Sequence, residues 1–114
     1  REELIDAPGP MDVVMGRGRR GVKLPGNVLL RRLQEEHYDA YNSMGSKVDK
    51  TCISQVILSG MRQAGCRFLV PVYEENGKMH RGRPVPKGWR EVDDDSARDR
   101  IGHGFRNLRQ ANKG

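Results

Sequence analysis

Large apolar side chains are scarce in this chain, and their scarcity limits the hydrophobic core that it can build. Val, Leu, Ile and Phe account for 24 of the 114 residues, about 21%, just above the range typical of disordered chains. A chain of this length ordinarily forms one domain. We therefore expect one small core, with residues 12–112 forming a single domain with a basic face. Residues 1–11 contain Pro8, Gly9 and Pro10 and are expected to form a flexible lead-in.

The sequence argues against several classes of protein. No segment approaches the ~20 consecutive apolar residues of a membrane span, so we expect no membrane partner. Two cysteines, Cys52 and Cys66, are too few for a disulfide scaffold and predict a reducing, intracellular setting. Neither they nor His37, His80 and His103 show the spacing of metal ligands. We predict no metal, no cofactor, no catalytic residue and no enzymatic activity.

The positive charge is concentrated in particular segments. The formal net charge is +6, and six bases with no acid lie between Val13 and Gln34, so the rest of the chain is balanced. Residues 76–90 and 100–114 are also free of acids and carry five and four Lys or Arg residues. Such segregation predicts a basic face that binds a polyanion. For any single segment, an unevenly charged solvated surface is the simpler interpretation.

Apolar spacing predicts two helices in the first half of the domain. Asn27 is a favourable N-cap for a helix that runs to about Tyr41. A second helix is expected to begin at Asp49 or Lys50 and to end before Gly65, which is typical of the C′ position. The expected inward positions are Leu30, Leu33, His37 and Tyr41 in the first helix, and Ile53, Val56, Ile57, Met61 and Ala64 in the second.

Three short strands and a third helix complete the expected fold. The strands are predicted at residues 12–15, 66–73 and 89–92, with loops at 16–26, 42–47 and 74–88. Pro71 places the latter half of the second strand at an edge or outside the ladder, and Cys66 and Trp89 are expected in the core. Asp94 or Asp95 is expected to cap the third helix, whose inward positions are Ala97, Ile101, Phe105 and Leu108. The result is an α+β fold with about three helices and a small antiparallel hairpin, similar to a winged helix.

Several short segments together resemble a known family. The segments are Gly16-Arg17-Gly18, Pro25-Gly26-Asn27, Arg67-Phe68-Leu69, Gly88-Trp89 with Val92, and Ala97-Arg98, in this order. They are similar to the signature of a domain of unknown function that is abundant in diatoms and related algae. Leu24 replaces a usual His, and Cys66 replaces a usual Gly. The resemblance covers roughly residues 12–109 and implies no catalytic residue or ligand. The many members of the family resemble an expansion of transcription factors.

The segment Gly16-Arg-Gly-Arg-Arg-Gly21 is the most informative local sequence. Arg-Gly-Arg fits a narrow A·T-rich minor groove, because Gly permits close approach of the backbone while Arg reaches the negative potential. The segment resembles the core of an AT-hook without its flanking prolines. Two other interpretations remain. The backbone could cradle a phosphate ahead of a helix, although no nucleotide-binding pattern is complete, or Gly16, Gly18 and Gly26 could simply supply positive φ in a tight loop.

Other basic residues extend this candidate surface. Arg31 and Gln34 are expected to point outward from the first helix, where they could read guanine and adenine edges, although a solvated face explains each one equally well. The loop before the last strand could follow phosphates as a wing does.

We therefore predict a DNA-binding domain of a nuclear, transcription-factor-like protein that contacts double-stranded DNA. The alternatives are a protein-interaction module for an acidic partner and a phosphate-ligand or RNA-binding domain. The candidate DNA contacts are Arg17, Gly18, Arg19, Arg20, Lys23, Asn27, Arg31, Gln34, Lys47, Lys50, Lys78, Arg81 and Arg83.

Overall fold

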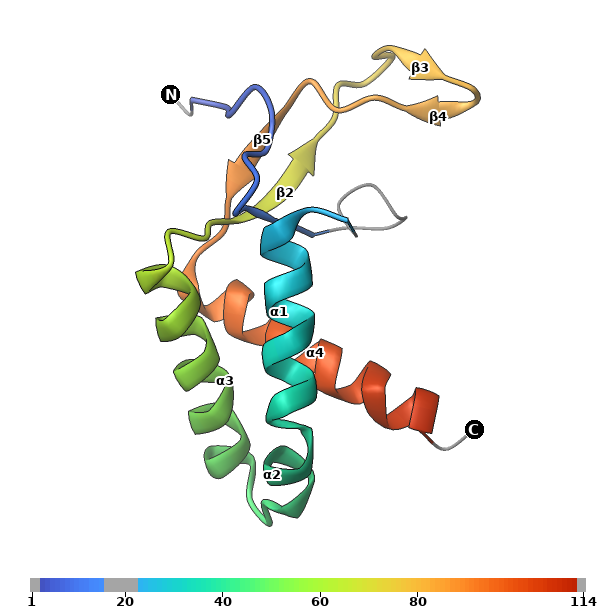
Figure 1. Cartoon of the computed structure of the whole chain (residues 1–114). Helices are drawn as coiled ribbons and strands as arrows, with labels where there is room; N and C mark the ends of the chain where they lie inside the picture. The colour runs from blue at the N-terminus through green and yellow to red at the C-terminus, as the bar shows by residue number, and fades with distance from the viewer. Residues whose placement is uncertain (1–2, 16–22, 113–114) are drawn as a thin grey trace.

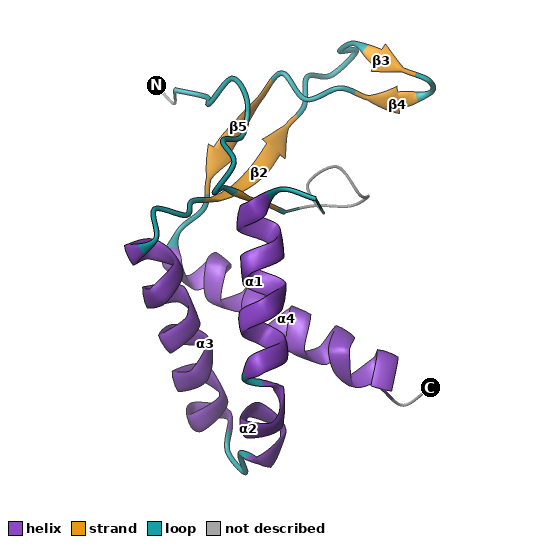
Figure 2. Ribbon diagram, viewed as in Figure 1, coloured by secondary structure: helices purple, strands orange, loops and turns teal. Residues whose placement is uncertain are grey.

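Three helices pack together at one end of the molecule and a small sheet lies at the other, as the computed structural model shows for residues 3–15 and 23–112 (Figures 1 and 2). The elements in chain order are β1 (Val13–Val14), α1 (Pro25–Glu36), α2 (Tyr38–Ser43), α3 (Lys47–Gln63), β2 (Phe68–Val72), β3 (Met79–His80), β4 (Arg83–Pro84), β5 (Gly88–Glu91) and α4 (Asp94–Asn112). The fold is therefore of the α+β class, as the sequence predicts.

The main sheet has the strand order β1-β2-β5. β1 runs parallel to β2, whereas β2 and β5 are antiparallel. β1 pairs only with Phe68 and Leu69, so Pro71 lies beyond its end with β5 as its paired neighbour. This arrangement satisfies the requirement that proline avoid the middle of a ladder. On the other side of β5, Ile5 forms a bridge with Trp89 through N–O distances of 2.8 and 2.9 Å, so part of the expected lead-in contacts the sheet.

The expected loop at residues 74–88 contains a second hairpin, formed by β3 and β4. Arg81 and Gly82 both have positive φ, 52° and 77°, which is typical of the type I′ turn that matches the twist of a hairpin. Arg-Gly is not one of the usual dipeptides for this turn, and the strands have only two residues each. For these reasons the sequence pattern did not predict the hairpin.

The starts of three helices differ from the expected ones. α1 begins at Pro25, which favours the first helical position because its missing N–H needs no partner, so Asn27 lies inside the helix rather than at its cap. α3 begins at Lys47 because the Ser46 hydroxyl accepts a hydrogen bond from the Asp49 N–H at 3.1 Å. At α4, the Asp93 carboxylate accepts from the Ser96 N–H at 2.8 Å. Asp93 is therefore the cap, in place of Asp94 or Asp95.

The first expected helix is divided in two at His37, where α1 ends and α2 begins. His37 is half-buried, as predicted, and one ring nitrogen lies 2.8 Å from the Leu33 carbonyl oxygen. After the break, Tyr41 still reaches the core and stacks on Phe105 with the ring centroids 4.0 Å apart. The apolar spacing therefore identifies the correct inward residues, although the backbone changes direction between them.

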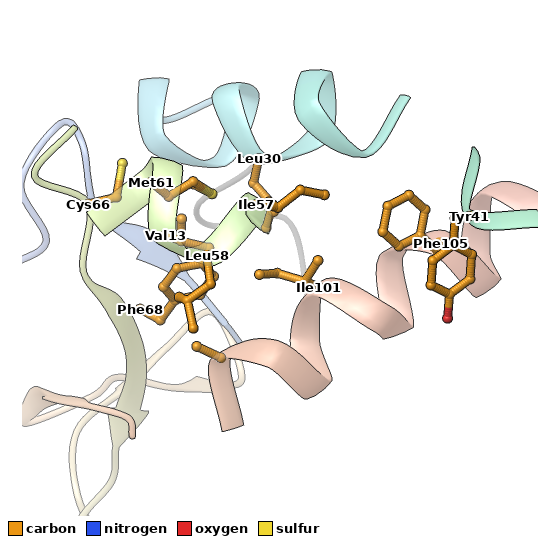
Figure 3. Close-up of a cluster of buried hydrophobic side chains, with 11 residues drawn as sticks. Val13, Leu30, Tyr41, Ile57, Leu58, Met61, Cys66, Phe68, Ile101 and Phe105 are labelled. Atoms are coloured by element: carbon orange, nitrogen blue, oxygen red, sulfur yellow. The ribbon is translucent and has the colours of Figure 1, made fainter. Parts of the chain in front are cut away.

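The core lies where α1, α3 and α4 meet the sheet (Figure 3). α4 contributes Ala97, Ile101 and Phe105, each 0% exposed and each predicted, while Leu108 is partly buried. The predicted inward positions of α3 were partly wrong. Val56 is 61% exposed and Ala64 is also exposed, whereas Leu58, which was not predicted, is buried. The other large buried side chains are Val13, Leu30, Ile57, Met61, Cys66, Phe68, Leu69 and Trp89.

A polar contact fixes the place where α1 crosses α4. Gln34 is only 4% exposed, and its side-chain N–H donates to the Ile101 carbonyl oxygen at 3.0 Å. Gly104 leaves the space for this amide, because a Cβ at Gly104 would overlap the Gln34 Nε2 and lie 2.5 Å from its Cδ. The glycine therefore permits a buried amide to sit between two helices.

We expect the substitution Gly104→Ala to destabilise the domain by up to about 2 kcal/mol. Displacing Gln34 leaves a buried amide without its partner, at a cost of about 1–3 kcal/mol, and alanine recovers only about 1 kcal/mol of helix propensity. Chemical denaturation measures the change. The variant Gly102→Ala is the control, because a Cβ at Gly102 would meet only the Tyr41 hydroxyl, at 4.0 Å. Equal stability changes at the two glycines would contradict the role of the Gln34 contact.

Candidate nucleic-acid interface

Two basic segments leave the sheet at the same end: the one after β1 contains no acid, and the one after β2 contains none beyond Glu74 and Glu75. Because β1 and β2 run parallel, their carboxyl ends, Val14 and Val72, point in the same direction. The Met15 N–H donates to the Leu69 carbonyl at 2.8 Å, which holds the end of β1 beside β2. The segment that follows β1 contains the candidates Arg17, Gly18, Arg19 and Arg20, which lie outside the described residues, and Lys23, which is exposed.

The segment that follows β2 forms the β3–β4 hairpin, which extends away from the three-helix body (Figure 1). Lys78, Arg81 and Arg83 are all exposed on it, and Lys87 is exposed just after it. The Val85 N–H donates to the Lys78 carbonyl at 2.9 Å, which closes the base of the hairpin. The topology thus brings these predicted residues to the same end of the sheet as the segment that follows β1.

The side chain of Asn27, another predicted DNA contact, forms hydrogen bonds within the protein. Its side-chain oxygen accepts from the Val14 N–H at 2.9 Å, and its side-chain nitrogen donates to the Val14 carbonyl at 3.2 Å. These backbone groups lie on the edge of β1 that does not face β2, so the carboxamide pairs with them as a neighbouring strand would. The Asn27 side chain is therefore engaged with β1 in this structure, and we leave it out of the candidate interface.

Gly26 has a different role from the positive φ considered above. The φ angle of Gly26 is not positive. Instead, a Cβ at Gly26 would overlap the Met11 carbonyl oxygen and lie 2.5 Å from that of Asp12. The Gly26 N–H also donates to the Pro10 carbonyl at 2.9 Å. Pro25-Gly26-Asn27 is therefore the segment that attaches the start of α1 to β1.

Arg31 and Gln34 do not form the predicted pair of outward residues. The Arg31 side chain is 70% exposed, with its Nε 3.8 Å from a Glu35 carboxylate oxygen. Gln34 faces α4 and is buried, so it is not available to read bases. The prediction placed Gln34 outside, but Gln34 lies four residues after Leu30 and therefore on the same face of α1. The space that Gly104 provides for it on α4 is not visible in the sequence of α1.

The start of α3, which contains Lys47 and Lys50, lies at the opposite end of the molecule from the β3–β4 hairpin (Figure 1). The 17 residues of α3 extend about 25 Å from the α2 end toward the sheet. The two lysines line a cavity of about 460 Å³ between α3 and α4, together with Arg98 and Asp99. The Lys50 Nζ lies 5.4 Å from the centroid of the Tyr41 ring. These lysines therefore do not share a surface with the hairpin.

A half-buried ion pair that the sequence did not suggest joins the start of β1 to the start of β2. Arg67 donates from its Nε at 2.9 Å and from its Nη2 at 2.7 Å to the two carboxylate oxygens of Asp12, and the Gly9 N–H also donates to Asp12 at 2.6 Å. Burial by itself raises the pKa of Asp12, but these hydrogen bonds and the Arg67 charge outweigh it and lower that pKa. No local pattern marks this pair, because its members are 55 residues apart.

The acidic residues at the start of α4 are engaged with the protein itself. The backbone N–H and hydroxyl of Ser96 lower the pKa of Asp93. Asp94 and Glu91 both accept hydrogen bonds from Arg62, at 2.8 and 3.0 Å. Within residues 3–15 and 23–112 there is no group of three or more His, Cys, Asp or Glu side chains that could hold a metal ion. The acidic cluster is thus a capping and ion-pairing feature.

Comparisons with known proteins give a single result. No match to a curated protein or to a solved structure is found. In the described part of the chain, no helix combines the length and apolarity needed to cross a membrane. A family model matches residues 12–107, which include Asp12, the Pro25-Gly26-Asn27 segment and most of α4. The chain therefore belongs to the family described as Domain of unknown function (DUF6824).

Proposed function

We propose that this domain binds duplex DNA through the end of the sheet at which β1 and β2 terminate, as the DNA-binding part of a nuclear regulatory protein. The observation that carries the proposal is the parallel pairing of β1 and β2, because it directs the acid-free segment after β1 and the basic hairpin segment beyond Glu74 and Glu75 to one end of the sheet. The resemblance of the ordered sequence motifs to an algal family with many members supports the regulatory role.

The two segments suit different parts of a duplex. Lys78, Arg81 and Arg83 on the β3–β4 hairpin would contact phosphates, which supply affinity but little sequence information. Arg17 and Arg19 would enter a narrow minor groove, where arginine recognises the enhanced negative potential. The proposed surface excludes Asn27 and Gln34, whose side chains are occupied by protein contacts, and Lys47 and Lys50, which lie at the other end.

The hairpin offers a test that removes charge without disturbing the backbone. Arg81 has φ of +52°, a conformation in which asparagine is more favourable than arginine, so Arg81→Asn should keep the turn. We expect the double variant Lys78→Gln/Arg81→Asn to weaken binding to random duplex DNA about equally for all sequences. With ~6 phosphates neutralised in the native protein, the slope of log K against log[salt] is about −5, and the variant should show about −3. Fluorescence anisotropy over a salt series measures both slopes.

The control is Lys47→Gln/Lys50→Gln, which also removes two positive charges but at the opposite end of the molecule. It should leave the slope of the native protein nearly unchanged. Equal loss in the control and the hairpin variant would contradict the proposed surface. If the native protein shows no salt-dependent DNA binding but captures an acidic protein in the presence of nuclease, the function is that of a protein-interaction module instead.

A further inference from the structure

A small cavity of about 230 Å³ lies between α1 and α4 on the side away from α3. Two arginines contribute to its lining, Arg31 from α1 and Arg100 from α4, and the polar residues Gln34 and Asn107 lie beside them. Every lining residue in the described part of the chain is basic or neutral. A pocket with two guanidinium groups and no carboxylate has the charge to bind an anion.

Arg100 is the residue that makes this pocket unusual. It is partly buried, and burial lowers the pKa of its guanidinium. The other partly buried arginines with described contacts are paired with carboxylates: Arg62 with Glu91 and Asp94, Arg67 with Asp12, and Arg98 with Asp95. The Arg100 side chain has no hydrogen bond, ion pair or ring contact with any residue in 3–15 or 23–112. A guanidinium that loses water without gaining a partner destabilises the folded protein.

Arg31 is held only weakly at the rim of the same cavity. Its Nε lies 3.8 Å from the Glu35 carboxylate, and the two side chains are 70% and 55% exposed. Exposed pairs of this kind contribute little to stability, so Arg31 is free to exchange Glu35 for another anion. A partly buried guanidinium on α4 and an exposed one on α1, both lining the same cavity, can together bind one tetrahedral anion.

We propose that the cavity between α1 and α4 binds one phosphate group, with Arg100 as the inner ligand and Arg31 as the outer one. Its volume lies below the ~300–1,000 Å³ of ordinary small-molecule sites, so it admits a single anionic group rather than a whole nucleotide. The phosphate can come from the backbone of bound DNA, in which case the inference rests on the proposed function, or from free phosphate.

The first measurement uses inorganic phosphate on the full chain in a phosphate-free buffer. Phosphate should raise the melting temperature of the native protein by roughly 2–4 °C. In Arg100→Met this rise should disappear, while the melting temperature without phosphate should equal or exceed the native value because a desolvated charge is gone. The control Arg106→Met removes an exposed arginine of α4 that lies outside this cavity and should keep the phosphate response.

The second measurement identifies the source of the phosphate. If DNA supplies it, Arg100→Met should make the salt slope of DNA binding shallower by about 0.9, the value for one phosphate. If phosphate raises the melting temperature but Arg100→Met leaves the salt slope of DNA binding unchanged, the site binds free phosphate. If phosphate raises the melting temperature and the protein binds no DNA, the site also binds free phosphate, and the proposed function is rejected. If Arg100→Met retains the phosphate response, or if the native protein shows no phosphate response, the pocket inference is overturned. The DNA-binding proposal is then tested separately, by the salt slope of DNA binding by the native protein.

Discussion

Replacing Gly26 with alanine is expected to lower the free energy of unfolding by about 3 kcal/mol. The added methyl group would overlap the Met11 carbonyl oxygen and approach that of Asp12 to 2.5 Å. Both obstacles are backbone atoms, so no change of rotamer relieves the overlap and α1 must move away from β1. That movement also stretches the two hydrogen bonds between Asn27 and Val14.

Gly60 provides the matched control for this substitution. It lies in α3, it is exposed, and no atom outside its own helix lies within 4 Å of an added Cβ. Gly60→Ala should therefore stabilise the domain by up to about 1 kcal/mol through helix propensity. Urea denaturation of both variants gives the comparison. Stability changes of the same sign would show that the start of α1 is not packed against β1 as described.

The second large effect is expected from Arg67→Met, which should cost about 3–4 kcal/mol near neutral pH. The two partners of the ion pair differ in exposure: the Asp12 side chain is 4% exposed, whereas that of Arg67 is 42% exposed. Removing the Arg67 side chain leaves a buried carboxylate with hydrogen bonds from the backbone at Gly9 and at residue 67 but no neighbouring cation to balance its charge. Removing the carboxylate in Asp12→Asn leaves a guanidinium that reaches water, so Asp12→Asn should cost less.

The pH dependence separates this effect from a general loss of packing. In the native protein the pKa of Asp12 is lowered, so its charge stabilises the fold above about pH 4 and that contribution is lost as the pH falls through the folded-state pKa. In Arg67→Met the carboxylate is buried without its cation, so acid should recover part of the lost stability. The double variant Asp12→Asn/Arg67→Met should be more stable at pH 7 than Arg67→Met alone. A cost that is independent of pH would contradict the ion-pair explanation.

The sequence predicted the elements whose determinants are local. The spacing of Ala97, Ile101 and Phe105 places one face of α4 in the core, and Gly65 has the positive φ, 84°, expected after α3. The strand around Phe68 and Leu69 follows from its apolar and β-branched residues. Each of these features depends on neighbours within a few positions, which is the range that periodicity reports.

The features that the sequence did not predict depend on distant partners. Gln34 is buried because Gly104 lies opposite it, and Asn27 is occupied because β1 presents a free edge. In the candidate interface, the exposure of Lys23, Lys78, Arg81 and Arg83 agrees with the prediction. The separation of Lys47 and Lys50 from them was not predictable, because it depends on the direction in which α3 runs relative to the sheet.

The parallel pairing of β1 with β2 also determines when the proposed surface can exist. Val13 pairs with Phe68 across three intervening helices, whereas β2 pairs with β5 through the hairpin between them. Contacts between residues that are near in sequence form faster than contacts between distant residues. We therefore expect β1 to join the sheet late in folding. The ends of β1 and β2, from which the two basic segments continue, then come together only in the last step. A nascent or partly unfolded chain carries the same charges but should bind nucleic acid without the geometry of the finished domain.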